Sequence, residues 1–465
     1  MELKTLFEGI ADAIREKDGS QGEITASAFP ERIRAIPTGG KVTLERIEIT
    51  APPEKTGYFA GERFDAAGMS VWAELSNGYG VYVNHSDLTF DPAGPLEAGT
   101  DSVTVRFQWG EQTASAAQAV QVAATQIYGV EWDGTSTTKL TRTDRAAGFA
   151  DPVPAVDNGD GSSPFDQLQP WAGMVRSSRA GGAMVAIPKF WYKFTKSGTA
   201  LKLQIADDKV DGFFVSPAHA DRGDGKGERD VVYVGRYHCA ADTYQSETNK
   251  AQMTGVTRSA ARTAIHSLGA GIWQFDMAMR LTIQMLYLVE FADWNSQAVI
   301  GFGCSPDGVK ENNGRTDAMK YCTGTTAASR DAYGHTQYRN IEGLWDNAYN
   351  WIDGCYNNDS GVSVILNPEE FDDLANGAVI GVPPGGYVTA FDVAEQDGVQ
   401  WLVPSGNGGS ESTYITDTWG FATYHPCIYG GGSCAQGMSR GIFLVSFHTL
   451  KGSDANIGCR LQELP

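Results

Sequence analysis

The spacing of apolar residues changes twice along this chain of 465 residues. Residues 1–40 carry them at helical spacing, and residues 41–124 alternate them with polar residues. Residues 125–465 mix short alternating runs with glycine-rich loops and hold one long apolar segment, Phe275–Phe291, which predicts a buried helix. We therefore expect a multidomain, mainly β chain with some α+β character: short N-terminal helices, a β-sandwich and a large C-terminal domain.

The first part, residues 1–40, is predicted to form two short helices. Asp18-Gly19 is a stop signal, and one apolar stripe is made by Leu3, Leu6, Phe7, Ile10 and Ile14. Helices of this length are marginal alone in water. The stripe is therefore expected to be buried. It packs either against the next domain or, the alternative we favour, in attachment to a larger assembly or in self-association.

Residues 41–124 are predicted to form an antiparallel sandwich of about seven short strands. Val71–Leu75 and Val103–Phe107, for example, alternate apolar and polar residues. The string Tyr58–Asp65, followed by Gly68–Val71, resembles the bacterial immunoglobulin-like modules (group 3 type) that repeat on surface proteins and phage structural proteins. The resemblance implies that this domain is a spacer rather than a ligand site.

The net charge of −20 excludes partners that require a basic surface. A nucleic-acid binder needs Lys and Arg to displace the counterions of the phosphate backbone, and the sequence has no such cluster. Anionic membrane surfaces are excluded for the same reason, and no apolar run reaches the ~18 residues that span a bilayer. Residues Met1–Ile10 lack the apolar region of a secretory signal, so we expect release by lysis or inside a particle.

Cysteine and histidine spacing predicts neither a metal site nor a redox centre. The seven cysteines include no C-x-x-C pair, and an odd count without a signal peptide fits folding in a reducing cytoplasm. Loops 157–161 and 221–228 carry oxygen ligands but depart from the EF-hand order, so solvated loops are expected, with calcium as the alternative. The sequence has no nucleotide-binding or nucleophile motif. We expect no cofactor, no metal and no catalytic residue.

Two motifs in the last domain carry a family resemblance. Gly343-Leu344-Trp345-Asp346-Asn347-Ala348-Tyr349-Asn350-Trp351 is similar to the Gly-Leu-Trp-Gly-Asn-x-Trp-Glu-Trp signature of formylglycine-generating-type enzymes and C-type-lectin-fold phage proteins. Asp346, Tyr349 and Asn350 replace the usual Gly, Trp and Glu. The run from Gly430, closing with Ile457-Gly458-Cys459-Arg460-Leu461, resembles the ending of variable proteins diversified by retroelements. Together the motifs imply a C-type lectin (formylglycine-generating-enzyme-like) fold for residues 125–465, with a hypervariable C-terminal face.

The C-terminal segment has the alternation that such a face requires. Within Ile442–His448, one side is predicted to face the core and holds Phe443, Val445 and Phe447. The other side is predicted to face outward and holds Leu444, Ser446 and His448. Tyrosine gives a large contact area at a small entropic cost, which favours it in binding loops. The predicted ligand-binding residues are Tyr424, His425, Cys427, Tyr429, Cys434, Gln436, Met438, Leu444, Ser446 and His448.

These features predict a binder, not an enzyme: a phage tail receptor-binding protein on the virion, assembled in the host cytoplasm. Its expected partners are a host-surface protein or glycan, tail or baseplate proteins through residues 1–40, and further copies in a homotrimer. One alternative is a bacterial surface adhesin of the same architecture, and another is a tail structural protein whose last domain only packs. A third is a formylglycine-type oxidase, which needs two neighbouring reactive cysteines, here Cys427 and Cys434.

Overall fold

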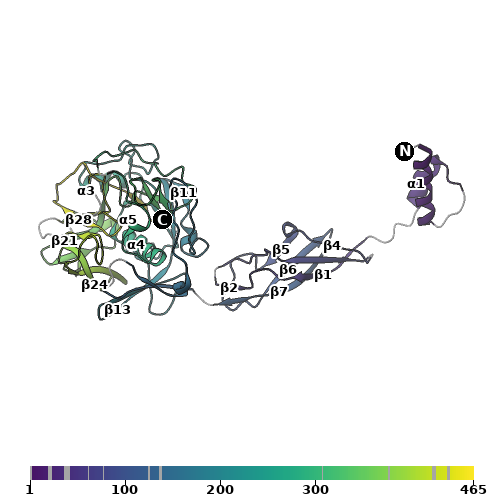
Figure 1. Cartoon of the computed structure of the whole chain (residues 1–465), viewed down its shortest axis with the longest axis horizontal. Helices are drawn as coiled ribbons and strands as arrows, with labels where there is room; N and C mark the ends of the chain where they lie inside the picture. The colour runs from purple at the N-terminus through teal and green to yellow at the C-terminus, as the bar shows by residue number, and fades with distance from the viewer. Residues whose placement is uncertain are drawn as a thin grey trace. The chain divides into compact units, whose positions relative to one another are not determined.

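The computed structural model of the chain is mostly β and separates into two compact units, Met1–Ala124 and Thr125–Pro465 (Figure 1). This division falls at the predicted start of the last domain, whereas the N-terminal helices group with the second part. No helix among the described residues is long and apolar enough to cross a bilayer. The described residues are 3–18, 23–35, 42–60, 62–76, 78–123, 126–135, 139–305, 307–374, 377–421, 426–436 and 440–465.

The helical prediction for the first part is confirmed in α1 (Leu3–Asp18) and α2 (Phe29–Ala35), which follow each other with a short 3-10 turn, η1 (Ala26–Ala28), between them. Ala11 and Ile14 of α1 pack with Ile24 and Phe29 in a small core. Leu6 and Phe7 remain 48% and 39% exposed, so part of the predicted stripe lies outside that core.

The rest of the first unit is built from short strands in three small sheets. Their orders are β1-β3-β4, β5-β6-β7 and the pair β2-β8, which is parallel and so departs from the all-antiparallel prediction. Alternate residues of β3 and β6, such as Val71, Ala73 and Val105, are buried in a core between the sheets. The strands are β1 (Leu44–Ala51), β2 (Gly57–Phe59), β3 (Ser70–Leu75), β4 (Gly80–Tyr82), β5 (Leu88–Asp91), β6 (Ser102–Trp109), β7 (Gln112–Ala119) and β8 (Gln121–Ala123), with the 3-10 turn η2 (His85–Asp87).

The second unit is organised around α4 (Met277–Phe291), which confirms the predicted buried helix. Every residue of α4 is buried, and the helix lies inside the second unit (Figure 1). It packs against β9, β14 and β21. Asp276 caps its first turn by accepting a hydrogen bond from the Met279 N–H at 2.8 Å. Two further helices, α3 (Arg258–His266) and α5 (Ser296–Val299), were not predicted from the sequence.

Four sheets surround this helix. Two have five strands, in the orders β10-β9-β14-β13-β15 and β11-β12-β16-β30-β17, and one has three, β18-β19-β20. These strands are β9 (Ile127–Trp132), β10 (Thr141–Asp144), β11 (Arg176–Arg179), β12 (Gly182–Pro188), β13 (Trp191–Ser197), β14 (Ala200–Ala206), β15 (Phe214–Val215), β16 (Val231–Gly235), β17 (Ile272–Gln274), β18 (Gly324–Thr325), β19 (Thr336–Tyr338), β20 (Ile341–Glu342) and β30 (Leu461–Glu463).

The fourth and largest sheet contains the C-terminal segment. Its order is β23-β22-β21-β27-β28-β26-β24-β25, and β29 pairs with β21. A Cβ atom on Gly381 in β23 would lie 2.7 Å from Val403 in β25, so the two ends of the sheet approach each other and the sheet curls toward a barrel. The strands are β21 (Tyr349–Asn358), β22 (Gly361–Val364), β23 (Ala378–Gly381), β24 (Gly386–Gln396), β25 (Val399–Asn407), β26 (Thr418–Trp419), β27 (Cys427–Gly430), β28 (Val445–His448) and β29 (Ile457–Gly458).

Candidate functional site

The two motifs meet in the middle of the large sheet. Strand β27 lies between β21, which belongs to the first motif, and β28, which belongs to the C-terminal segment. Trp351 of β21 stands opposite Tyr429 of β27, and Tyr429 stands opposite Ser446 of β28. Directly opposed residues project from the same face of a sheet. Trp351, Tyr429 and Ser446 therefore form one row across three strands.

The first side of the C-terminal segment faces the main core, as predicted, at two of its three positions. Phe443 and Val445 are 6% and 1% exposed and pack in the main core, which also contains α4. Phe447 is only partly buried and lies over Gly420, where a Cβ atom would come within 2.9 Å of its ring.

The prediction that the opposite side faces outward is wrong for Leu444 and Cys427. They are 2% and 1% exposed and lie in a second hydrophobic core with Trp351. Ala261 and Ile265 of α3 close this core from the other side. The large sheet is thus covered on both faces here, because α3, which the sequence did not predict, buries part of the face assigned to ligand.

Three predicted residues remain partly exposed on this face: Tyr429, Ser446 and His448, which we call the display surface. The Tyr429 ring centroid is 4.7 Å from that of Tyr349 and 5.9 Å from that of Trp351. The His448 ring is 6.0 Å from Trp351. Buried aromatic rings therefore lie beside Tyr429 and His448.

The other predicted positions have different outcomes. Cys434 is fully buried, so its predicted exposure is also wrong. Gln436 is partly exposed. Tyr424, His425 and Met438 lie outside the described residues.

Side chains from distant elements hold the backbone of the segment that leads into the display surface. Arg280 of α4 donates hydrogen bonds to the carbonyls of Ile442 and Leu444, both at 2.7 Å, and Gln284 donates to Ile442 at 2.8 Å. Asp417 accepts the Phe443 N–H at 2.8 Å. The backbone path of residues 442–444 thus depends on α4 and on the segment before β26.

Two further arginines fix the ends of the C-terminal segment. Arg440 donates to the carbonyls of Ser433 and Cys304. Arg460, from the closing Ile-Gly-x-Arg-Leu motif, donates to the carbonyls of Gly235 and Glu342, both at 2.6 Å. Both guanidinium groups are fully buried, and each one joins strands or loops that are far apart in sequence.

Glycines in the C-terminal motif let its backbone lie directly against the first motif. A Cβ atom on Gly431 would lie 2.3 Å from the Leu344 carbonyl oxygen, and one on Gly432 would lie 2.4 Å from that of Trp345. Gly431 also has φ +93°, a conformation that favours glycine. The glycines of the second motif are therefore needed for contact with the first.

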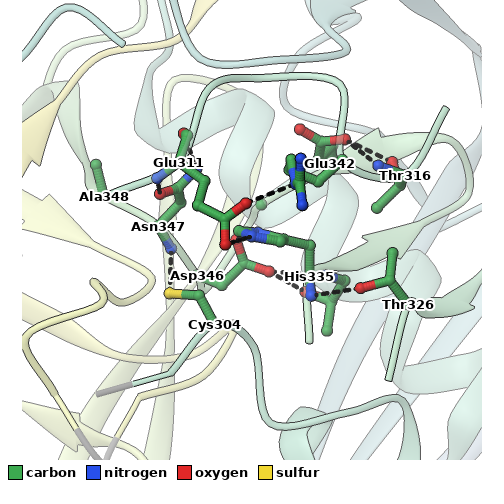
Figure 2. Close-up of polar contacts among 12 residues, drawn as sticks. Cys304, Glu311, Thr316, Thr326, His335, Glu342, Asp346, Asn347 and Ala348 are labelled. Carbon is green, nitrogen blue, oxygen red and sulfur yellow. Dashed lines mark hydrogen bonds and ion pairs between the residues drawn. The ribbon is translucent and has the colours of Figure 1, made fainter. Parts of the chain in front are cut away.

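Asp346 and Asn347, in the middle of the first motif, belong to a buried polar network (Figure 2). Asp346, fully buried, accepts hydrogen bonds from the N–H and hydroxyl of Thr336 at 2.7 and 2.9 Å, and lies 3.4 Å from His335 Nδ1. On the other side of the ring, His335 Nε2 lies 3.7 Å from Glu311. Asn347 bonds both backbone groups of Glu311 through its side-chain amide and donates its N–H to Cys304 Sγ at 3.1 Å.

The charges in this network stabilise one another. Burial acts to raise the pKa of Asp346, but hydrogen bonds from His335 and Thr336 outweigh it and hold that pKa below its ordinary value. Burial acts to lower the pKa of His335, and the hydrogen bond to Asp346 reverses this and raises it. Asp346, which replaces the usual glycine, therefore has a buried carboxylate whose hydrogen bonds are provided by His335 and Thr336.

The two cysteines assigned to oxidase chemistry lie in different surroundings. Cys427 is in the second core near Arg258, whereas the backbone N–H of Cys434 bonds the carbonyl of Asn347 at 3.2 Å. Burial raises the pKa of Cys427 to about 11 and also raises that of Cys434. Reactive cysteines need a lowered pKa, and burial shifts the pKa of both thiols in the opposite direction.

Sequence analysis missed the polar side chains that hold the C-terminal segment. One signal was available, because Arg280 and Gln284 are polar residues four positions apart in a largely apolar helix. Their partners in the segment lie more than a hundred positions away, so the sequence did not indicate what they bind.

No protein-family model matches this chain, and no curated protein is similar to it. Its function is therefore inferred from its own residues.

Proposed function

We propose that this protein is a receptor-binding protein of a bacteriophage tail that recognises a host-surface ligand through the display surface. The proposal gives residues 125–465 a C-type lectin fold and residues 41–124 an immunoglobulin-like fold. The resemblance of the two motifs supports it, because the residues that carry the resemblance contact each other. The protein would act on the virion, as a homotrimer attached through residues 1–40.

One observation carries the proposal: the segment before the display surface is positioned by side chains that do not belong to it. Arg280, Gln284 and Asp417 bond its backbone at residues 442–444, so the path of that backbone does not depend on the side chains at positions 446 and 448. Binding residues carried by a rigid scaffold can change without unfolding it. This is the property that a hypervariable recognition surface requires.

The chemistry of the display surface suits recognition. A phenol, a hydroxyl and an imidazole offer hydrogen-bond donors and acceptors, and the aromatic rings beside Tyr429 limit its motion. Such a surface has modest affinity at a single site, and several copies on one particle would raise the total binding strength.

Binding of the full-length protein to host cells tests this function. The double variant Tyr429→Ala/His448→Ala should lower cell binding by about tenfold or more, because tyrosine truncation at an interface removes about 1–2 kcal/mol or more. Tyr333→Ala is a matched control, since Tyr333 is 45% exposed and is not part of the display surface. Equal binding by the wild type and the double variant would contradict the proposal.

The same assay separates the two binding alternatives only when it is combined with genetics. An adhesin would use the same surface, but its gene would not lie beside genes for tail or baseplate proteins. Hypervariability has its own test, a near-copy of codons 424–448 that differs mainly at adenines. Failure to find this copy would contradict diversification by a retroelement, but it would not contradict ligand binding by the display surface.

A further inference from the structure

The first unit carries an aromatic corner on the outer face of its β1-β3-β4 sheet. Alternation in β3 places Val71 and Ala73 in the core, so Trp72 lies on the opposite, solvent side. Trp72 stands opposite Tyr82 of the edge strand β4, and Tyr82 is 67% exposed. Two large aromatic side chains are therefore adjacent on a face that the core does not use.

Gly80 lets the indole of Trp72 lie flat on the sheet. A Cβ atom on Gly80 would lie 2.3 Å from Cε2 and Cζ2 of Trp72 and 2.5 Å from its Nε1. The ring thus covers the backbone of β4 and turns one of its faces outward. Tyr82 stands beside it with the ring centroids 4.9 Å apart and the planes at 72°. The two rings are therefore nearly perpendicular, with Trp72 parallel to the sheet and Tyr82 projecting from it.

Charged side chains surround this corner on the same face. Glu48 of β1 stands opposite Trp72. Glu74, two residues after Trp72 in β3, forms an ion pair with Arg46 at 2.5 Å. Arg46 also lies 3.5 Å from Glu48. The side chain of Arg46 is 63% exposed, that of Glu48 56% and that of Glu74 36%. Their remaining donors and acceptors are therefore accessible to a ligand.

We propose that this corner, defined by Trp72, Tyr82, Arg46, Glu48 and Glu74, binds a neutral saccharide. The apolar C–H face of a pyranose ring would stack on Trp72 against Tyr82, and its hydroxyls would exchange hydrogen bonds with the guanidinium and the carboxylates. The domain is then a second, weaker attachment site and not only a spacer.

Two other occupants fit the corner less well. A protein interface needs an apolar centre, whereas the other outward residues on β1 and β3 here are Thr50, Ser70 and the three charged residues. A cationic ligand such as choline needs free carboxylates beside the rings, and both carboxylates already contact Arg46. A ligand with many hydroxyls uses ion-paired donors and acceptors without breaking them.

Affinity electrophoresis of the full-length protein tests the proposal. The net charge of −20 carries the protein through native gels, and we would cast these with hydroxyethyl cellulose, laminarin, mannan or glycogen. At least one polysaccharide should retard the wild type. Trp72→Ala should raise the dissociation constant by about tenfold, and Tyr82→Ala should raise it by severalfold.

Controls make the result specific to the corner. Trp109→Ala removes a tryptophan of the same unit that is 40% exposed and lies on β6, and it should leave retardation unchanged. Tyr429→Ala/His448→Ala should also leave it unchanged, which separates this site from the display surface. If Trp72→Ala does not fold, as judged by its thermal transition, Trp72→Phe and Tyr82→Ala carry the test.

Three results would overturn the proposal. The first is no retardation of the wild type by any of the four polysaccharides. The second is retardation that survives in folded Trp72→Ala. The third is Trp72-dependent binding of choline, or Trp72-dependent self-association, without retardation by a polysaccharide.

Discussion

Leu444 and Ser446 lie on the same side of the C-terminal segment, two positions apart, yet their environments differ. Leu444 is buried with Trp351 and the residues of α3, whereas Ser446 is partly exposed on the display surface. The difference arises because other elements pack over this face of the sheet at Leu444 but leave it partly exposed at Ser446. Alternation identifies the side of a residue, and only the packing of other elements decides whether that side meets water.

The contrast predicts different costs for the two truncations. Leu444→Ala should lower the free energy of unfolding of the 125–465 unit by about 2–5 kcal/mol, because it opens a cavity in the second core. Ser446→Ala should change it by less than about 0.5 kcal/mol. Calorimetric unfolding of the full chain measures both. A small effect of Leu444→Ala on the free energy of unfolding would contradict the burial of Leu444 in the second core.

Asp417 makes the stability of the second unit depend on pH. Burial raises the pKa of this carboxyl to about 7, so the folded state keeps its proton while the unfolded state loses it near pH 4. Stability from this group is therefore complete below about pH 4 and falls by about 1.4 kcal/mol per unit until about pH 7. Asp417→Asn should flatten the pH dependence in that window, because its amide oxygen still accepts the Phe443 N–H. An unchanged pH profile of the melting temperature would contradict this assignment.

At the scale of elements, α4 supports both the core and the C-terminal segment. Burial lowers the pKa of Arg280 to about 10, and its guanidinium serves the carbonyls of Ile442 and Leu444. Arg280→Met keeps the length of the side chain and leaves two buried acceptors with fewer donors. The Ile442 carbonyl keeps the Gln284 amide and the Leu444 carbonyl keeps the Gly431 N–H, so neither acceptor is left without a donor. We expect a loss of about 3–6 kcal/mol, from about 1.5–3 kcal/mol for each of the two lost hydrogen bonds to a charged group.

Hydrogen exchange locates this effect. The amides of residues 441–446 should exchange faster in Arg280→Met, whereas those of β9 and β14 should keep their protection. Gln284→Met is the matched control, since it removes only one donor, to Ile442, and should have a smaller effect. Equal protection of residues 441–446 in the wild type and Arg280→Met would exclude α4 as their support.

The sequence predicted the elements whose own pattern is strong. The apolar run of α4 was sufficient, and the alternation of the C-terminal segment placed Phe443 and Val445 correctly. It did not predict α3, whose buried residues are few and include Arg258 and Ala261 beside Ile265. The site depends on that missing helix, because α3 closes the second core over Leu444. Contacts between Arg280 and the C-terminal segment span 162 positions and leave no local pattern.

At the scale of the whole molecule, the attachment of many copies decides whether a modest display surface is sufficient. Residues 1–40 are the part of the chain with the smallest core, and a segment of this size usually needs oligomerisation to become stable. Leu6 and Ile33 remain 48% and 52% exposed on its helices. In the proposed homotrimer, these exposed side chains would form the contact between copies.

Leu6→Asp/Ile33→Asp should therefore convert the homotrimer to a monomer, because each substitution places a charge where an apolar side chain would be buried between copies. Light scattering after gel filtration measures the mass, and calorimetry should show that the 125–465 unit unfolds as before. Cell binding should fall with the mass, since it loses the contribution of multiple copies. Thr5→Asp/Ser27→Asp adds the same charge at exposed polar positions and should remain trimeric. A wild type that is already monomeric would contradict the homotrimer.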